Sequence, residues 1–163
     1  VVFPAGKVVQ TTVPNRAATY TTGTPGSWSA SVVNGSITPL YDNSAIIIFA
    51  NWCGDVDGET GGDFGFGVKW VKTGTGVVNA SGSPLIGPVI QEEGHSYMYR
   101  NAFNYARLTN GHCAVLMDND CETTNEITYT MHFVTYEVNG NIRIGGNNWD
   151  NHQWSVYFQE IKR

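Results

Sequence analysis

The stretch Ile127-Thr128-Tyr129-Thr130-Met131-His132-Phe133 decides the fold class of this chain. Its large apolar side chains fall on every second residue, with polar side chains between them. A period of two is typical of a β-strand with one buried face, whereas a helix repeats its apolar side chains every three to four residues. Three further stretches alternate in the same way, with the apolar sets Trp28/Ala30/Val32 (opposite Ser29 and Ser31), Phe64/Phe66/Val68/Trp70 and Trp154/Val156/Phe158.

Outward from these strands, the unbroken apolar run Ala45–Ala50 predicts a central strand that is covered on both faces. Gly54–Gly62 and Thr73–Pro88 are predicted to be long loops. Weaker strand patterns lie at 6–13, 17–22, 95–100, 111–117 and 141–144. Turns are predicted at Thr24-Pro25-Gly26, Asn34-Gly35, Asn110-Gly111, Asp118-Asn119-Asp120 and Asn139-Gly140, the last as a hairpin between Tyr136–Val138 and Asn141–Ile144.

Eight to ten short strands without a helical pattern predict an all-β protein, an antiparallel β-sandwich of the jelly-roll type. With 163 residues, the chain is expected to be one domain. We expect residues 1–5 to be an N-terminal docking segment and residues 6–163 to be the sandwich.

The charge pattern and the lengths of the apolar runs argue against two classes of partner, nucleic acid and membrane. Charged residues make up 14% of the chain, against roughly 25% in an average soluble protein. The net charge of −5 and nine scattered basic residues do not make a surface that binds a phosphate backbone. No apolar run approaches the roughly 20 residues of a membrane span. We therefore expect neither nucleic acid nor a membrane as partner.

The three cysteines, Cys53, Cys113 and Cys121, do not form the even-numbered pattern of a secreted disulfide scaffold. Buried free thiols are the favoured interpretation, and a bridge between Cys113 and Cys121 is the alternative. A zinc site from His112, Cys113 and Cys121 is disfavoured, because no paired ligands stand at the required spacing. The count suits a protein made in a reducing cytoplasm.

Acidic residues gather in two turn-like segments. Asp55, Asp57 and Glu59 alternate as in the start of a calcium loop, but the remaining ligand positions of such a loop are missing. Asp118 and Asp120 flank Asn119 in a second acidic turn, where such residues also cap turns on their own account. These four aspartates are weak metal candidates, and the sequence predicts no metal and no cofactor.

Catalytic chemistry is not indicated. The cluster Glu92, Glu93 and His95 supplies acid–base groups, but nothing places a second carboxylate opposite them, as glycoside cleavage requires. Nucleophile elbows, zinc-protease motifs and phosphate-binding loops are absent from the sequence. We expect the protein not to be an enzyme.

The segment Asn147–His152 is the best candidate for ligand binding. It places Trp149 between Asn148, Asp150 and His152, and an aromatic ring with polar neighbours suits the apolar face and hydroxyl groups of a sugar. The alternative is a surface turn in which Trp149 folds onto the sandwich edge or a subunit interface.

Both ends of the chain carry a series of short stretches that together form a recognisable pattern of strands. Gly6-Lys7-Val8-Val9-Gln10 opens it, a Thr-rich strand Thr19–Thr22 follows, and Ile37-Thr38-Pro39 precedes Ser44-Ala45-Ile46-Ile47-Ile48. Near the C-terminus the pattern continues with Glu126–Met131, Asn141–Ile144 and Trp154–Ile161. It resembles a family of small virion proteins of tailed bacteriophages, especially marine and cyanobacterial phages. Ala45 stands where that family usually has Lys, and the middle of the chain, residues 51–125, is not distinctive.

This resemblance implies a jelly-roll sandwich similar to the C1q and tumour-necrosis-factor domains, usually a homotrimer mounted on the virion after assembly in the host cytoplasm. Such proteins serve as capsid decoration (cement) proteins, head fibres or tail-fibre tips, and the pattern carries no catalytic residue. We expect capsid decoration, because the short chain lacks a shaft to project it from a tail. The partners would then be other copies of the chain and the major capsid protein or another virion protein. The apolar residues Val1, Val2, Phe3 and Pro4 are expected to dock on a neighbouring subunit. A fibre tip that binds a host-surface carbohydrate is the alternative.

Overall fold

The computed structural model describes residues 5–23, 26–58, 62–77, 96–100, 106–135, 140–145 and 153–163. Throughout these ranges the regular structure is β-strand, and no helix is present. No helix in them is therefore long and apolar enough to cross a membrane. The strands are β1 (Val8–Thr11), β2 (Asn15–Ala17), β3 (Tyr20–Thr22), β4 (Ser29–Ile37), β5 (Ala45–Gly58), β6 (Gly62–Gly74), β7 (Ser96–Arg100), β8 (Ala106–Asp118), β9 (Ile127–Thr135), β10 (Gly140–Gly145) and β11 (Trp154–Ile161).

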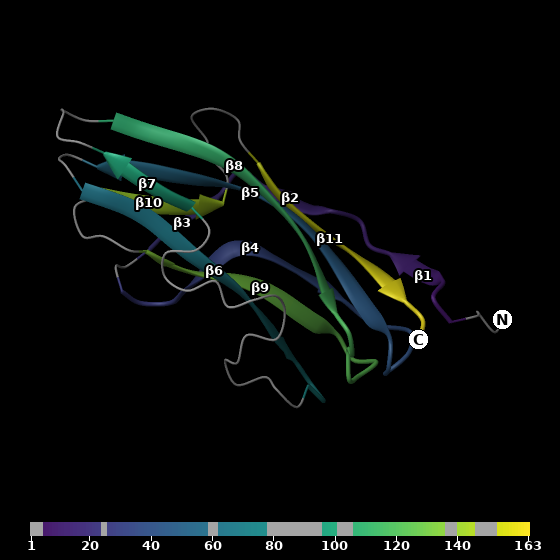
Figure 1. Ribbon diagram of the computed structural model, residues 1–163. Coiled ribbons are helices and arrows are strands. Elements are labelled where there is room, and N and C mark those ends of the chain that lie inside the picture. Colours follow the sequence, from purple (N-terminus) through teal and green to yellow (C-terminus); the bar gives the residue numbers. More distant parts are fainter. Residues whose placement is uncertain are drawn as a thin grey trace.

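The strands form two antiparallel sheets (Figure 1). The large sheet has seven strands in the order β1-β11-β5-β10-β3, with β2 also on β11 and β8 also on β5. The small sheet has four strands in the order β4-β9-β6-β7. The prediction of an all-β, antiparallel protein is confirmed, and each predicted strand overlaps an observed one.

Strand β5 is the centre of the large sheet. Along one side it pairs with β8 from Ile46 to Gly58, and on the other it pairs first with β11 and then with β10. Because both neighbours continue past Gly54, the backbone there satisfies its hydrogen bonds as a strand. The prediction of a loop from Gly54 to Gly62 is therefore wrong as far as Gly58.

The core lies between the two sheets. Ile127, Tyr129, Met131 and Phe133 of β9 are all 0% exposed, which confirms the alternation read from the sequence. They meet the alternating side chains of β11 and β5 from the opposite sheet. The facing side chains are Trp154, Val156, Phe158, Ile46, Ile48, Ala50 and Trp52.

Strand β4 corrects two predictions. Its buried side chains are Ser31, Val33 and Ile37, whereas Ala30, on the face predicted to be buried, is exposed and Val32 is only partly buried. The register of β4 against β9 shifts by two residues between Ala30 and Asn34, which leaves the inward face unchanged. On that face the small residues Ser29 and Gly35 pair with Phe133 and Tyr129 of β9, so the buried side of β4 is not its more apolar side. Asn34-Gly35 is not a turn but part of this strand.

Gly35 has a packing role. A Cβ added there would lie 2.9 and 3.1 Å from two ring carbons of Phe158, so the ring occupies the space of a side chain. Glycine in a strand interior often marks such a close approach.

Two other turn predictions also change. Asn110-Gly111 lies inside β8, where its residues pair with Gly54 and Cys53. Gly140 begins β10, but β10 pairs with β5 and β3 in the large sheet, while β9 belongs to the small sheet. The segment Tyr136–Val138, expected to be the hairpin partner, lies outside the described residues, as do Thr24, Pro25 and residues 78–88.

Candidate functional site

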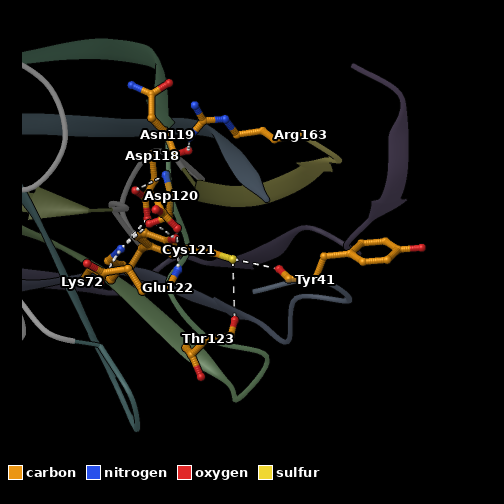
Figure 2. Close-up of polar contacts among 10 residues, drawn as sticks. Tyr41, Lys72, Asp118, Asn119, Asp120, Cys121, Glu122, Thr123 and Arg163 are labelled. Carbon is orange, nitrogen blue, oxygen red and sulfur yellow. Dashed lines mark hydrogen bonds and ion pairs between the residues drawn. The ribbon is translucent and has the colours of Figure 1, made fainter. Parts of the chain in front are cut away.

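A buried lysine is the centre of the most concentrated group of charges in the described chain. Lys72 extends the apolar face of β6, on which Val68 and Trp70 lie, and its side chain is 1% exposed. Its Nζ contacts Asp118 Oδ2 at 2.9 Å and Glu122 Oε2 at 3.2 Å, and it donates a hydrogen bond of 2.8 Å to the carbonyl oxygen of Asp120. Figure 2 shows the ammonium group beside the acidic turn.

Hydrogen bonds within the turn from Asp118 to Glu122 hold it in the shape that places these oxygens around Lys72. The Asp120 amide donates to Asp118 Oδ1 at 3.3 Å, and the Glu122 amide donates to Asp120 Oδ1 at 3.0 Å. Glu122 has a φ of 67°, a left-handed conformation uncommon for a residue with a side chain. The predicted acidic turn exists: Asn119 and Asp120 are exposed, while Asp118 and Glu122 contact the buried ammonium group of Lys72.

Of the metal candidates, Asp118 binds the Lys72 ammonium group through its carboxylate, and Asp120 accepts from it through the backbone carbonyl oxygen. Among the described residues no group of three or more His, Cys, Asp or Glu side chains is arranged to hold a metal ion. Asp55 and Asp57 lie in the paired part of β5, opposite Arg143 and Asn141, and not in a loop.

Tyr129 completes the cluster. Its hydroxyl group donates a 2.8 Å hydrogen bond to Asp118 Oδ2, and the residue is 0% exposed. Burial, followed by the negative charge of Asp118, raises the pKa of Tyr129 well above its ordinary value of 10. The phenol thus stays protonated and acts as a fixed hydrogen-bond donor.

Cys121 joins the acidic turn to the segment before β5 (Figure 2). Its Sγ donates to the Tyr41 carbonyl oxygen at 3.0 Å, and its amide donates to the Ser44 carbonyl oxygen at 2.9 Å. Burial raises the pKa of the Cys121 thiol above its ordinary value, so the group is held as a neutral thiol. On the other side of the turn, Arg163 donates to the Asn119 carbonyl oxygen.

A second buried carboxylate, Glu160, holds the same segment from β11. It extends the buried face of Val156 and Phe158 and is 0% exposed. Its oxygens accept hydrogen bonds from the Leu40 amide at 2.9 and 3.0 Å, the Tyr41 amide at 3.1 Å and Ser44 Oγ at 2.6 Å. Several donors on one carboxylate satisfy its lone pairs where water has no access.

Together these groups form what we call the polar end: Lys72, Tyr129, Asp118, Glu122, Cys121 and Glu160. Lys72 and Tyr129 come from the small sheet, and Asp118 and Glu160 come from the large sheet. The arrangement ties the two sheets together through charge-assisted bonds. Its chemistry is structural, because each ionised group is engaged in holding backbone or an opposite charge.

Neither Lys72 nor Glu160 was singled out from the sequence, although a signal was present. Each continues the apolar alternation of its strand by one further step, Val68-Trp70-Lys72 and Val156-Phe158-Glu160. A charged residue on the apolar side of a strand indicates a buried charge with a dedicated partner.

A pocket of about 540 Å³ opens on the large sheet, beside β5, where β10 ends and β11 begins. It is lined by Asn51, Trp52, Cys53, Gly111, His112, Cys113 and Gln153. The rings of Trp52 and His112 stack there with centroids 5.7 Å apart. The pocket offers carboxamide groups and thiols to a ligand.

All three cysteines are free thiols, so the alternative of a Cys113–Cys121 bridge is excluded. Cys53 and Cys121 are buried as expected, whereas Cys113 is exposed.

The remaining candidates lie outside the described residues. They are the docking residues Val1, Val2, Phe3 and Pro4, the sugar-binding candidates Asn148, Trp149, Asp150 and His152, and the acid–base cluster Glu92, Glu93 and His95. The described residues that flank the second group, Gly145 and Gln153, lie at the pocket, opposite Cys53 and in the lining.

Comparison with protein-family models, with curated proteins and with solved structures finds no match to this chain.

Proposed function

We propose that this chain is a non-enzymatic structural protein of a tailed-phage virion, a jelly-roll trimer that decorates and cements the capsid. It would act by contact, with the major capsid protein or another virion protein and with its own copies as partners. Its place of action is the assembled virion.

One observation carries the proposal: four of the sequence motifs that resemble phage virion proteins are joined by side-chain hydrogen bonds. Gln10, from the opening motif, donates from Nε2 to the carbonyl oxygen of Thr38 in the Ile-Thr-Pro motif at 2.8 Å. Glu160, from the closing motif, accepts from Ser44, which begins the central strand motif. Motifs far apart in the sequence thus share one physical task, which is to fasten the ends of the sandwich. A strand pattern with that task fits a protein that acts through its shape.

The strand order supports the jelly-roll part of the proposal. One sheet contains β1-β11-β5-β8 and the other contains β4-β9-β6-β7. From β4 to β6 and from β7 to β10 the chain passes back and forth between the sheets, as in a Greek-key sandwich, instead of forming successive hairpins. The paired β1 and β11 bring both ends of the described chain to one edge.

The chemistry of the described residues supports a role without catalysis. The buried side chains of Lys72, Asp118 and Glu160 are engaged in ion pairs and hydrogen bonds that hold loops and sheets together. Low charge suits a subunit packed in an assembly, because the core of an interface is depleted of charged side chains.

Host-glycan binding at a tail-fibre or head-fibre tip is the second candidate. The pocket beside β5 favours it, because Asn51 and Gln153 offer carboxamide groups that suit sugar hydroxyls. In the sequence, Trp149 stands between Gly145, which pairs with Cys53, and Gln153, which lines the pocket.

Immunogold electron microscopy of intact virions, with antibody against this chain, separates the two candidates. Label over the heads supports capsid decoration, and label at fibre tips supports glycan binding. Virions without label refute both. Deletion of Val1–Pro4 tests the docking segment: we expect the folded oligomer to persist while attachment to the virion weakens, and unchanged attachment would refute that role.

A further inference from the structure

The outward side of the large sheet carries large apolar side chains that are open to solvent. Val115 is 67% exposed and Met117 is 51% exposed, both on β8. They lie directly opposite Phe49 and Ile47 of β5, which are half-buried. On the far side of β5, Tyr157 of β11 pairs with Phe49, and their rings stack with centroids 4.6 Å apart. We call these five residues the outer face.

The outer face is also free of charged side chains. Along the paired stretch Ala45–Asn51 of β5, the other residues on its side of β8, β5 and β11 are Cys113, Asn51, Gln159, Ser155, Ile161 and Ala45, none of which carries a charged group. The nearest charged residue on a neighbouring strand is Arg16 of β2, which pairs with Ser155 at the margin of this stretch. Two copies of a chain with a net charge of −5 repel each other wherever carboxylates meet. An uncharged apolar face lets identical chains approach without opposing like charges.

The size of the face fits this use. Three strands, β8, β5 and β11, about 4.8 Å apart and paired over about seven residues of about 3.4 Å each, span about 340 Å². That area lies within the roughly 300–600 Å² of the largest apolar patch on a monomer, which is often functional. In a trimer each of the three copies contributes one such face, about 1,000 Å² in total, and the edge of β8 adds to the contact.

The exposed edge of β8 also favours a second copy of this chain as the partner of the outer face. In the described sheet this strand pairs with β5 on one side only, and Ala114 and Leu116, which pack on the core, remain partly exposed. A long apolar edge strand is an aggregation hazard unless another element covers it. A neighbouring copy would cover the edge and the outer face together.

We propose that the outer face, Ile47, Phe49, Val115, Met117 and Tyr157, is the surface on which copies of this chain pack against one another. The inference rests on the trimer of the proposed function and adds where its subunits meet.

The test is the molar mass of the purified chain, by size-exclusion chromatography with light scattering, for wild type and for the double variant V115E/M117E. Both side chains are exposed in the single chain, so circular dichroism should remain that of a folded sandwich. We expect three chains of 17.8 kDa for wild type and a threefold lower mass for the variant. The control is V13E, the same change at a residue that is 88% exposed and off the outer face, which should keep the wild-type mass. Alkylation of Cys113, next to Val115 on β8, should be faster in the double variant than in wild type.

The outcomes distinguish the contact surface from the trimer itself. A folded V115E/M117E protein with the wild-type mass would refute the outer face as the contact between copies but would leave the trimer unaffected. If that variant does not fold, the milder V115T/M117Q decides in the same way, and assembly as strong as that of V13E would refute the inference. A monomeric wild type would refute both the surface and the trimer. A trimer that depends on the outer face but is absent from virions would refute only the proposed function.

Discussion

Replacement of Lys72 by methionine tests whether the polar end holds the sandwich together. Methionine keeps an unbranched apolar side chain of similar length but removes the ammonium group. Asp118, whose side chain is 8% exposed, then loses its cation in a place that water scarcely reaches. Removal of one partner of a buried ion pair typically costs about 3–5 kcal/mol. Glu122 adds little to this, because its side chain is 21% exposed and can turn toward solvent.

For a chain of this length the loss corresponds to a fall in melting temperature of roughly 6–20 °C. Urea unfolding followed by tryptophan fluorescence measures it directly, with a midpoint lower by about 2 M if the urea slope is about 2 kcal/mol per M. The control is K69M in the same strand, where the half-buried Lys69 lies 4.5 Å from the Trp28 ring centroid and about 0.5–1 kcal/mol is at stake. The double variant K72M/D118N should recover much of the loss, because the introduced carboxamide still accepts from Tyr129 without leaving a charge. A K72M protein as stable as K69M would refute the structural role of the cluster.

Three further predictions concern single sites. G35A should destabilise the fold by about 1–3 kcal/mol, because the new Cβ meets the Phe158 ring at 2.9 Å. The control G111A, whose new Cβ has nothing within 4 Å, should be near neutral, and equal urea midpoints for the two variants would contradict this packing. Burial, followed by the charge of Lys69, holds the pKa of His132 below 6.5, so on acidification the unfolded chain binds a proton at His132 before the folded chain does. The contribution of His132 to stability is therefore full above pH 6.5 and falls below it. Urea midpoints measured from about pH 7 downward should decrease less for H132Q than for wild type. Cys121 should resist iodoacetamide in the native protein and react after unfolding, as peptide mapping would reveal; rapid native alkylation would place its thiol at the surface.

The strands were predictable where alternation is strong and uninterrupted. In β9 and β11 every second side chain is large and apolar, and those side chains form the core. The face of β4 was predicted wrongly, because small residues form its buried side, where Ser29 and Gly35 pair with Phe133 and Tyr129 of β9. The apolar alternation of β4 itself does not contain the size of the side chains that face it.

Turn signals failed for a related reason. Gly35 is small because Phe158 fills the space beside it, and not because the backbone reverses there. The propensity of Asn-Gly for turns was overridden by pairing with a neighbouring strand, β9 for Asn34-Gly35 and β5 for Asn110-Gly111. For Gly111, whose missing side chain would meet nothing, no packing reason is found.

The polar end was the part of the site that sequence reasoning missed. The alternation was followed to Trp70 and to Phe158 but not to the charged residues one step beyond, Lys72 and Glu160. Their partners, Asp118 and the backbone amides of Leu40 and Tyr41, are 46 to 120 residues away and depend on the pairing of the two sheets. The sequence therefore contains the buried charges, but only the fold identifies what neutralises them.

The most direct test of the proposed function is quantitative mass spectrometry of gradient-purified virions. We predict that this chain sediments with intact particles, in a fixed ratio to the major capsid protein, and remains bound after washing with salt. The proposal of a virion structural protein would be contradicted if the chain were found only in the soluble fraction of the lysate, with none in the particles.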